Sequence, residues 1–207
     1  EIENKVEMPE ILPHKCVTEV LAETEEFVEP IDNYSADKRM LAGEQEGAQI
    51  VYFKLAKAEI DNNYQDNEKV LKHIIDVIRR ISNDPEVEIA RVALLGLSSP
   101  EGAFDFNKRL SGKRAEALKQ YITARIALAD SCFALVNGDE GWEELRYKVE
   151  HSDMEYRKEV LNIIDFVPIM KGREGQLQRL KRGVPYRYLE EHFFPQLRRA
   201  GYIKVYY

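Results

Sequence analysis

The segment at residues 94–115 constrains the fold more than any other part of the sequence. It begins as an apolar run that includes Gly96, passes through a Ser-Ser-Pro-Glu-Gly turn at residues 98–102, and continues as a charged amphipathic segment from about Phe104. This order is typical of a strand, a tight loop and a helix. Such a loop presents backbone N–H groups at the start of a helix, where the helix dipole favours a negative group. The sequence therefore predicts a binding site at this junction.

The rest of the chain predicts further strands and helices. Four apolar segments are expected as strands, at residues 48–55, 87–98, 132–136 and 202–207. Apolar residues recur at three- and four-residue spacing over about 64–82 and predict a helix there. A turn is expected at 137–141.

Seven positions of the central segment match a known motif. It reads roughly G-[HY]-T-D-x-x-G-x-x-x-x-N-x-x-L-S-x-x-R-A, and the matching residues here are Gly96, Gly102, Asn107, Leu110, Ser111, Arg114 and Ala115. The chain thus resembles the OmpA-like, peptidoglycan-associating domain of bacterial envelope proteins, in an extended version similar to that of Bacteroides-type proteins. Before the last predicted strand, Arg198 and Arg199 resemble the basic pair that closes the family's domain.

The resemblance covers about residues 48–207 and implies an α+β fold. The expected architecture is an OmpA-like β-α-β-α-β…β sandwich, a mixed sheet with helices on one face. A helical insertion at about 140–199 is expected before the last strand. Residues 1–47 are interpreted as an acidic N-terminal arm or linker, because they hold 13 acidic and four basic side chains, against 24 and 26 in the remainder.

The resemblance also implies a ligand, the diaminopimelate side chain of a peptidoglycan stem peptide. This zwitterion needs an anion for its ammonium and a cation for its carboxylate. Arg114 matches the family's cation, and its planar guanidinium suits a carboxylate. The motif's acid, however, is replaced by the neutral Ser99. Either Glu101 or Asp105 supplies the anion, or the loop binds something else, or it binds nothing and Arg114 is kept for structure.

The expected ligand-binding residues belong to the loop and the helix after it. They are Ser98, Ser99, Glu101, Gly102, Asn107 and Arg114. Of these, Asn107 is expected to brace the loop through hydrogen bonds from its side chain to the backbone.

No motif of catalysis, metal binding or cofactor binding is found in the sequence. The histidines lack metal-ligand spacing, and neither a P-loop nor a dinucleotide fingerprint nor a nucleophile elbow occurs. The acidic loop at 61–72 lacks the glycine and glutamate of a calcium-binding loop. We therefore expect no enzyme activity, no catalytic residues, no metal and no cofactor.

Charge, hydropathy and cysteine usage limit the partners and the location. The net charge of −7 disfavours nucleic acid as a partner, and no apolar run reaches the roughly 20 residues of a membrane helix. Because no signal peptide is present and the sequence starts at Glu1, we interpret it as a chain whose export signal has been removed. A bridge between Cys16 and Cys132 stays open, but the apolar surroundings of Cys132 favour a buried thiol.

Two functions are expected. The first is a non-catalytic module on the periplasmic side of the outer membrane, which anchors an envelope component to peptidoglycan and reaches the membrane through a part outside this chain. The alternative is the same fold with a decayed wall site, acting as a structural or protein-interaction domain in envelope assembly, with envelope proteins as its partners. The neutral Ser99 and the long insertion favour the alternative.

Overall fold

The computed structural model describes residues 49–86, 89 and 91–206, and the acidic arm lies outside this range. Its centre is a four-stranded mixed sheet with the order β1-β4-β2-β3. The strands are β1 (Ile50–Tyr52), β2 (Arg91–Ser98), β3 (Phe133–Glu140) and β4 (Arg199–Tyr206). β4 is antiparallel to β1 and β2, whereas β2 and β3 are parallel. The predicted α+β class is confirmed.

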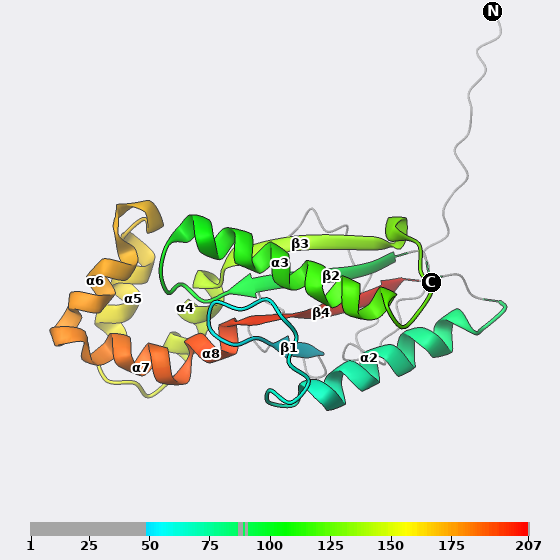
Figure 1. Ribbon diagram of the computed structural model, residues 1–207. Coiled ribbons are helices and arrows are strands. Elements are labelled where there is room, and N and C mark those ends of the chain that lie inside the picture. The colour runs from blue at the N-terminus through cyan, green and yellow to red at the C-terminus, as the bar shows by residue number, and fades with distance from the viewer. Residues whose placement is uncertain (1–48, 87–88, 90, 207) are drawn as a thin grey trace, which may run out of the picture.

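Two helices, α2 (Asn67–Ser82) and α3 (Phe104–Thr123), pack on the same face of the sheet (Figure 1). Their apolar stripes meet the inward residues of the strands in one core. Its fully buried members include Val51, Leu71, Ile74, Ile78, Val92, Leu118 and Ile122. The predicted helical spacing is therefore confirmed in α2, and burial of this stripe is the main stabilising contribution of the helix.

The strand β2 and the helix α3 approach each other most closely at Gly96. A Cβ atom added to Gly96 would lie 1.9 Å from the backbone oxygen of Ser111 and 2.9 Å from the backbone nitrogen of Ala115. Position 96 therefore has room only for glycine. The residue lies within β2 and not in the loop that follows it. This strand–helix contact explains why the motif has a glycine at position 96.

Five helices form the insertion between β3 and β4. They are α4 (Trp142–Glu150), α5 (Arg157–Phe166), α6 (Arg173–Arg179), α7 (Val184–His192) and α8 (Phe194–Leu197), with the 3-10 turns η3 (Ile169–Lys171) and η4 (Leu180–Gly183) between them. They enclose a second core at one end of the sheet, on the left in Figure 1. Leu97, at the end of β2, belongs to this second core. The predicted insertion before the last strand is confirmed.

Three sequence-based expectations need correction. First, β1 ends at Tyr52, because after Phe53 the backbone carbonyls hydrogen-bond to a buried arginine instead of a strand. Second, β3 continues to Glu140 through the segment expected as a turn, since Glu140 pairs with Ser98 of β2. Third, Cys132 is only partly buried, because it ends the 3-10 turn η2 (Asp130–Cys132) before β3. Among the helices of the described ranges, none is long and apolar enough to cross a membrane.

Candidate functional site

The candidate site lies where β2 ends and α3 begins, beside the insertion (Figure 1). Ser98 is buried there, and its Oγ lies 2.9 Å from the backbone oxygens of both Asn107 and Asp139. This hydroxyl can donate to either carbonyl, one belonging to α3 and one to β3. Ser98 thus ties the end of β2 to both neighbouring elements.

A carboxylate lies beside Ser99, the position of the motif acid. Ser99 donates a hydrogen bond from its hydroxyl to Oε2 of Glu101. Arg198 binds the same carboxylate, with Nη2 2.6 Å from Oε1 and Nε 3.0 Å from Oε2. Asp105, the other candidate anion, is exposed in the first turn of α3. Of the two acids that the sequence offered, Glu101 is the one next to Ser99.

The guanidinium of Arg114 is fully buried beneath the site. Its Nε donates to the carbonyl of Lys57 at 3.0 Å, its Nη1 to that of Leu97 at 2.8 Å, and its Nη2 to that of Lys54 at 3.4 Å. Its Cζ lies 5.3 Å from the ring centroid of Phe53. Arg114 therefore fastens the chain after β1 to the end of β2.

Burial is also the main influence on the charge of Arg114. Desolvation, followed by the positive charge of Arg198, lowers the pKa of Arg114 to about 9, against the smaller opposing effect of Glu101. The guanidinium is thus still a cation at neutral pH. A buried charge is tolerated when its hydrogen bonds are satisfied, and the three carbonyls supply this.

Asn107 braces the loop as predicted. Its Nδ2 donates to the carbonyl of Glu101 at 2.9 Å and to Oε1 of Glu140 at 2.8 Å. The other oxygen of Glu140 accepts a hydrogen bond from Trp142 Nε1 at 2.7 Å. Desolvation raises the pKa of Glu140, although these two hydrogen bonds act in the opposite direction. Sequence reasoning missed Glu140, because its position required β3 to extend through the expected turn.

The insertion reaches the loop at Gly102. This glycine has φ +92°, which explains its place in the motif, and its N–H donates to Oε1 of Glu174 at 3.0 Å. The same oxygen accepts a hydrogen bond from the Tyr186 hydroxyl at 2.7 Å. Burial and this bond raise the pKa of Tyr186. Sequence spacing carried no signal for Glu174, and it marked Arg198 only as part of the closing basic pair.

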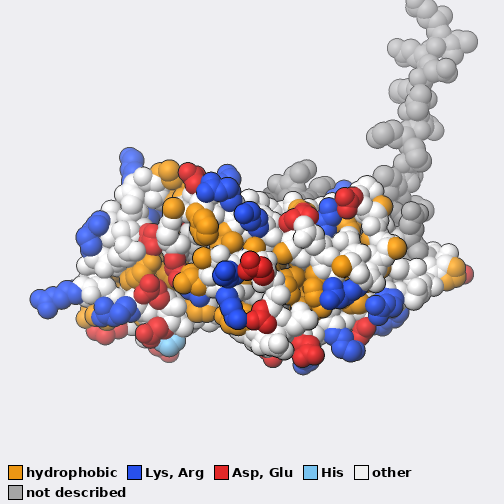
Figure 2. Space-filling model, viewed as in Figure 1, with side chains coloured by type: hydrophobic (Ala, Val, Ile, Leu, Met, Phe, Trp, Pro, Cys, Tyr) orange, Lys and Arg blue, Asp and Glu red, His pale blue; other side chains and the backbone are white. Residues whose placement is uncertain are grey.

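The surface around these elements carries charges of both signs. Figure 2 shows Lys and Arg interspersed with Asp and Glu on the viewed face, with apolar side chains between them. This face therefore presents a mixed charge pattern.

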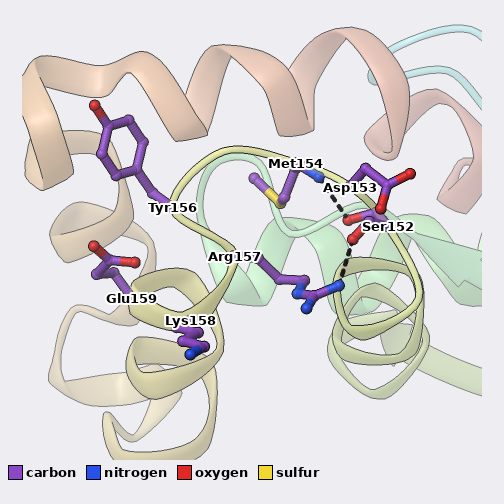
Figure 3. Close-up of a pocket in the computed structure, with 7 residues that line it drawn as sticks. All are labelled: Ser152, Asp153, Met154, Tyr156, Arg157, Lys158 and Glu159. Atoms are coloured by element: carbon purple, nitrogen blue, oxygen red, sulfur yellow. Dashed lines mark hydrogen bonds between the residues drawn. The ribbon is translucent and has the colours of Figure 1, made fainter.

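A separate shallow pocket of about 380 Å³ lies at the connection between α4 and α5 (Figure 3). Arg157 crosses it, with Nη1 2.7 Å from the carbonyl of Ser152. Tyr156, which caps α5 in a left-handed conformation, stands at its other side. Because its central cation is already bound to the backbone, we assign no ligand to this pocket. Within the described residues, no three His, Cys, Asp or Glu side chains are grouped to hold a metal ion.

No protein-family model and no curated protein matches this sequence. Several solved structures are similar, including the two that follow. The peptidoglycan-associated lipoprotein from Burkholderia pseudomallei matches with a TM-score of 0.41 and 15% identity, over 77% of this chain and 90% of that one. The cell wall anchor of the T6SS from Pseudomonas aeruginosa matches with a TM-score of 0.39 and 14% identity, over 86% and 96%.

Proposed function

We propose that this chain is a non-catalytic cell-envelope module that binds peptidoglycan through the diaminopimelate side chain of the stem peptide. It would anchor an outer-membrane component to the wall, on the periplasmic side, as an extended Bacteroides-type OmpA-like domain. The membrane link would come from a part outside this chain, and neither metal nor cofactor is involved.

One observation carries the proposal: the motif residues meet at a single loop that holds both charges a zwitterion needs. Ser98, Ser99, Gly102, Asn107 and Arg114 all lie at the β2–α3 junction, and the carboxylate of Glu101 stands beside Ser99. The cations are Arg198, paired with Glu101, and Arg114 below it. Charge-assisted hydrogen bonds of this kind are the strong ones in ligand recognition.

Retention on cell walls tests the proposal. The wild-type chain should sediment with diaminopimelate-containing peptidoglycan, and Arg114→Ala should weaken this retention, because Arg114 holds the floor of the site. The matched control is Arg109→Ala, which removes an exposed arginine from the same helix and should leave retention unchanged. If wild type and Arg114→Ala both wash off freely, wall binding is wrong.

A second function, a structural or protein-interaction domain in envelope assembly, is favoured by a different observation. Arg114 is already bound to three carbonyls, and Glu101 is already bound to Arg198, so the expected ligand groups have partners within the chain. A wild-type chain that is folded by circular dichroism, yet fails to bind peptidoglycan even at low salt, would favour this function over the first.

A further inference from the structure

We propose that Arg198 is the residue that binds the ligand's carboxylate, with Glu101 binding its ammonium, and that Arg114 only positions them. The Glu101–Arg198 ion pair would then be a preformed site for the ammonium and carboxylate of an α-amino acid. Without a ligand, the two side chains bind each other. This inference rests on the proposed function and assigns the binding roles within the same site.

Access separates the two arginines. The side chains of Arg198 and Glu101 are 11% and 15% exposed, whereas Arg114 has no exposed surface. A ligand that stays attached to a large wall polymer can reach only groups with some solvent contact. Arg198 and Glu101 meet this condition, and Arg114 does not.

The hydrogen bonds of Arg114 give the same assignment. If it turned toward a ligand, the carbonyls of Lys54, Lys57 and Leu97 would lose their donor. Leaving buried polar groups without partners is costly in free energy, so the Arg114 side chain stays bound to these carbonyls. Its role is to hold the chain after β1 against the end of β2.

The backbone of Arg198 is held by a hydrogen bond in which its side chain takes no part. The carbonyl of Arg198 accepts a hydrogen bond from the N–H of Phe53 at 2.7 Å, next to the first residue of β4. Within the part of the chain that the structure describes, the guanidinium is hydrogen-bonded to the Glu101 carboxylate and, at 3.4 Å, to the Ser99 hydroxyl. Both of these groups can also bind an ammonium.

An amino-acid end can replace this pair without losing charged contacts. The ligand's ammonium takes the carboxylate of Glu101, and its carboxylate takes the two-pronged guanidinium of Arg198. The hydrogen bonds between Glu101 and Arg198 are replaced by bonds from each of them to an opposite charge of the ligand, and no covalent bond changes. A side chain that ends in an ammonium alone would leave Arg198 without a partner.

The test compares two stem peptides, one with meso-diaminopimelate and one with L-lysine, which lacks the terminal carboxylate. In calorimetric titrations, the wild type should bind the diaminopimelate peptide more tightly. Arg198→Gln should weaken binding of that peptide by about 30-fold or more. It should bind the lysine peptide at least as tightly as the wild type does, because no arginine then loses its partner, so the discrimination disappears. Glu101→Gln should weaken the binding of both peptides, because both carry the ammonium that Glu101 binds.

Three further variants separate recognition from folding. Arg146→Gln/Asp165→Asn removes a comparable Arg–carboxylate pair within the insertion, with Nε 2.7 Å from Oδ1, and should change neither affinity. Arg114→Lys should keep the discrimination. If Arg198→Gln does not fold, Arg198→Lys keeps the charge without the two-pronged geometry and should reduce the discrimination several-fold.

The outcomes distinguish this inference from the proposed function. A wild type that binds neither peptide contradicts the proposed function. A wild type that discriminates, together with a folded Arg198→Gln or Arg198→Lys that discriminates equally well, overturns the assignment of Arg198. If a folded Arg114→Lys no longer discriminates between the two peptides while the Arg198 variants still do, Arg114 is the residue that binds the ligand's carboxylate.

Discussion

At the scale of single residues, Gly96 makes the sharpest prediction about stability. Gly96→Ala places a Cβ atom 1.9 Å from the backbone of α3, which cannot move aside as a flexible side chain can. We expect a loss of about 3 kcal/mol in the free energy of unfolding, measured in urea, or failure to fold.

The matched control is Gly175→Ala, in the first turns of α6. The atom nearest to a Cβ there is in the flexible guanidinium of Arg179, at 3.4 Å. This change should stabilise the protein by about 0.5–1 kcal/mol through helix propensity. Equal effects of the two glycine substitutions would show that β2 and α3 do not meet at Gly96 as described.

Glu140 makes a prediction about pH. Burial raises its pKa above the usual 4.5, so the folded chain holds this proton more tightly than the unfolded one. Stability contributed by Glu140 is therefore present below pH 4.5 and falls as the pH rises from there toward the raised value. Glu140→Gln removes this proton equilibrium.

The measurement is the difference in unfolding free energy between wild type and Glu140→Gln, from pH 4 upward. Glutamine keeps only one of the two acceptors that serve Asn107 and Trp142, so the variant should be less stable at low pH. Its deficit should shrink as the pH rises. A deficit that is independent of pH would mean that Glu140 has an ordinary pKa.

The motif indicated which residues meet at the β2–α3 junction, but not how exposed each of them is. The motif spacing correctly indicated that Asn107 braces the loop. It carried no information on the depth of Arg114, which is decided by the distant segment at 54–57 that crosses over it. The partner of Glu101 was hidden for the same reason, because Arg198 lies 97 residues further along the chain, beyond the insertion.

At the scale of elements, helices were predicted better than strand ends. The apolar stripe of α2 follows directly from its sequence, since a helical face is a local pattern. The length of β3 depends instead on its pairing with β2, which continues through the glycine-containing segment 137–140. Strand ends are set by neighbours that a local pattern does not contain.

The contact between α6 and the β2–α3 loop can be tested by hydrogen exchange. Glu174→Ala removes the acceptor of the Gly102 N–H, so exchange of this amide should accelerate about tenfold or more. The amide of Asn107, which donates to the carbonyl of Ala103, serves as an internal control and should not change. Glu190→Ala removes an exposed acid from α7 and should affect neither amide. Unchanged exchange at Gly102 would contradict the contact.

At the scale of the whole molecule, two cores share one strand. Leu94 of β2 belongs to the core under α2 and α3, and Leu97 belongs to the core of the insertion. Sequence reasoning predicted the insertion and its helices, but not that it would share β2, because this depends on how the chain returns to the sheet. We therefore expect both cores to unfold together.

Two matched substitutions test this coupling. Leu71→Ala and Leu177→Ala each remove a fully buried leucine, one from each core, and each should cost about 2–5 kcal/mol. Fluorescence of Trp142, the only tryptophan, reports on the insertion, and far-UV circular dichroism reports on the whole chain. The two signals should shift together in both variants. Separate transitions would show that the insertion unfolds independently.

The place of β4 has a consequence for how the chain is made. This strand lies between β1 and β2 in the sheet, yet the ribosome synthesises it only after the entire insertion. Until then β1 has no strand to pair with, and one side of β2 stays open. Pairings between such distant segments form slowly, so the nascent chain carries an unfinished sheet through most of its translation. A chaperone bound to this open edge would be displaced only once residues 199–206 have been synthesised and pair with it.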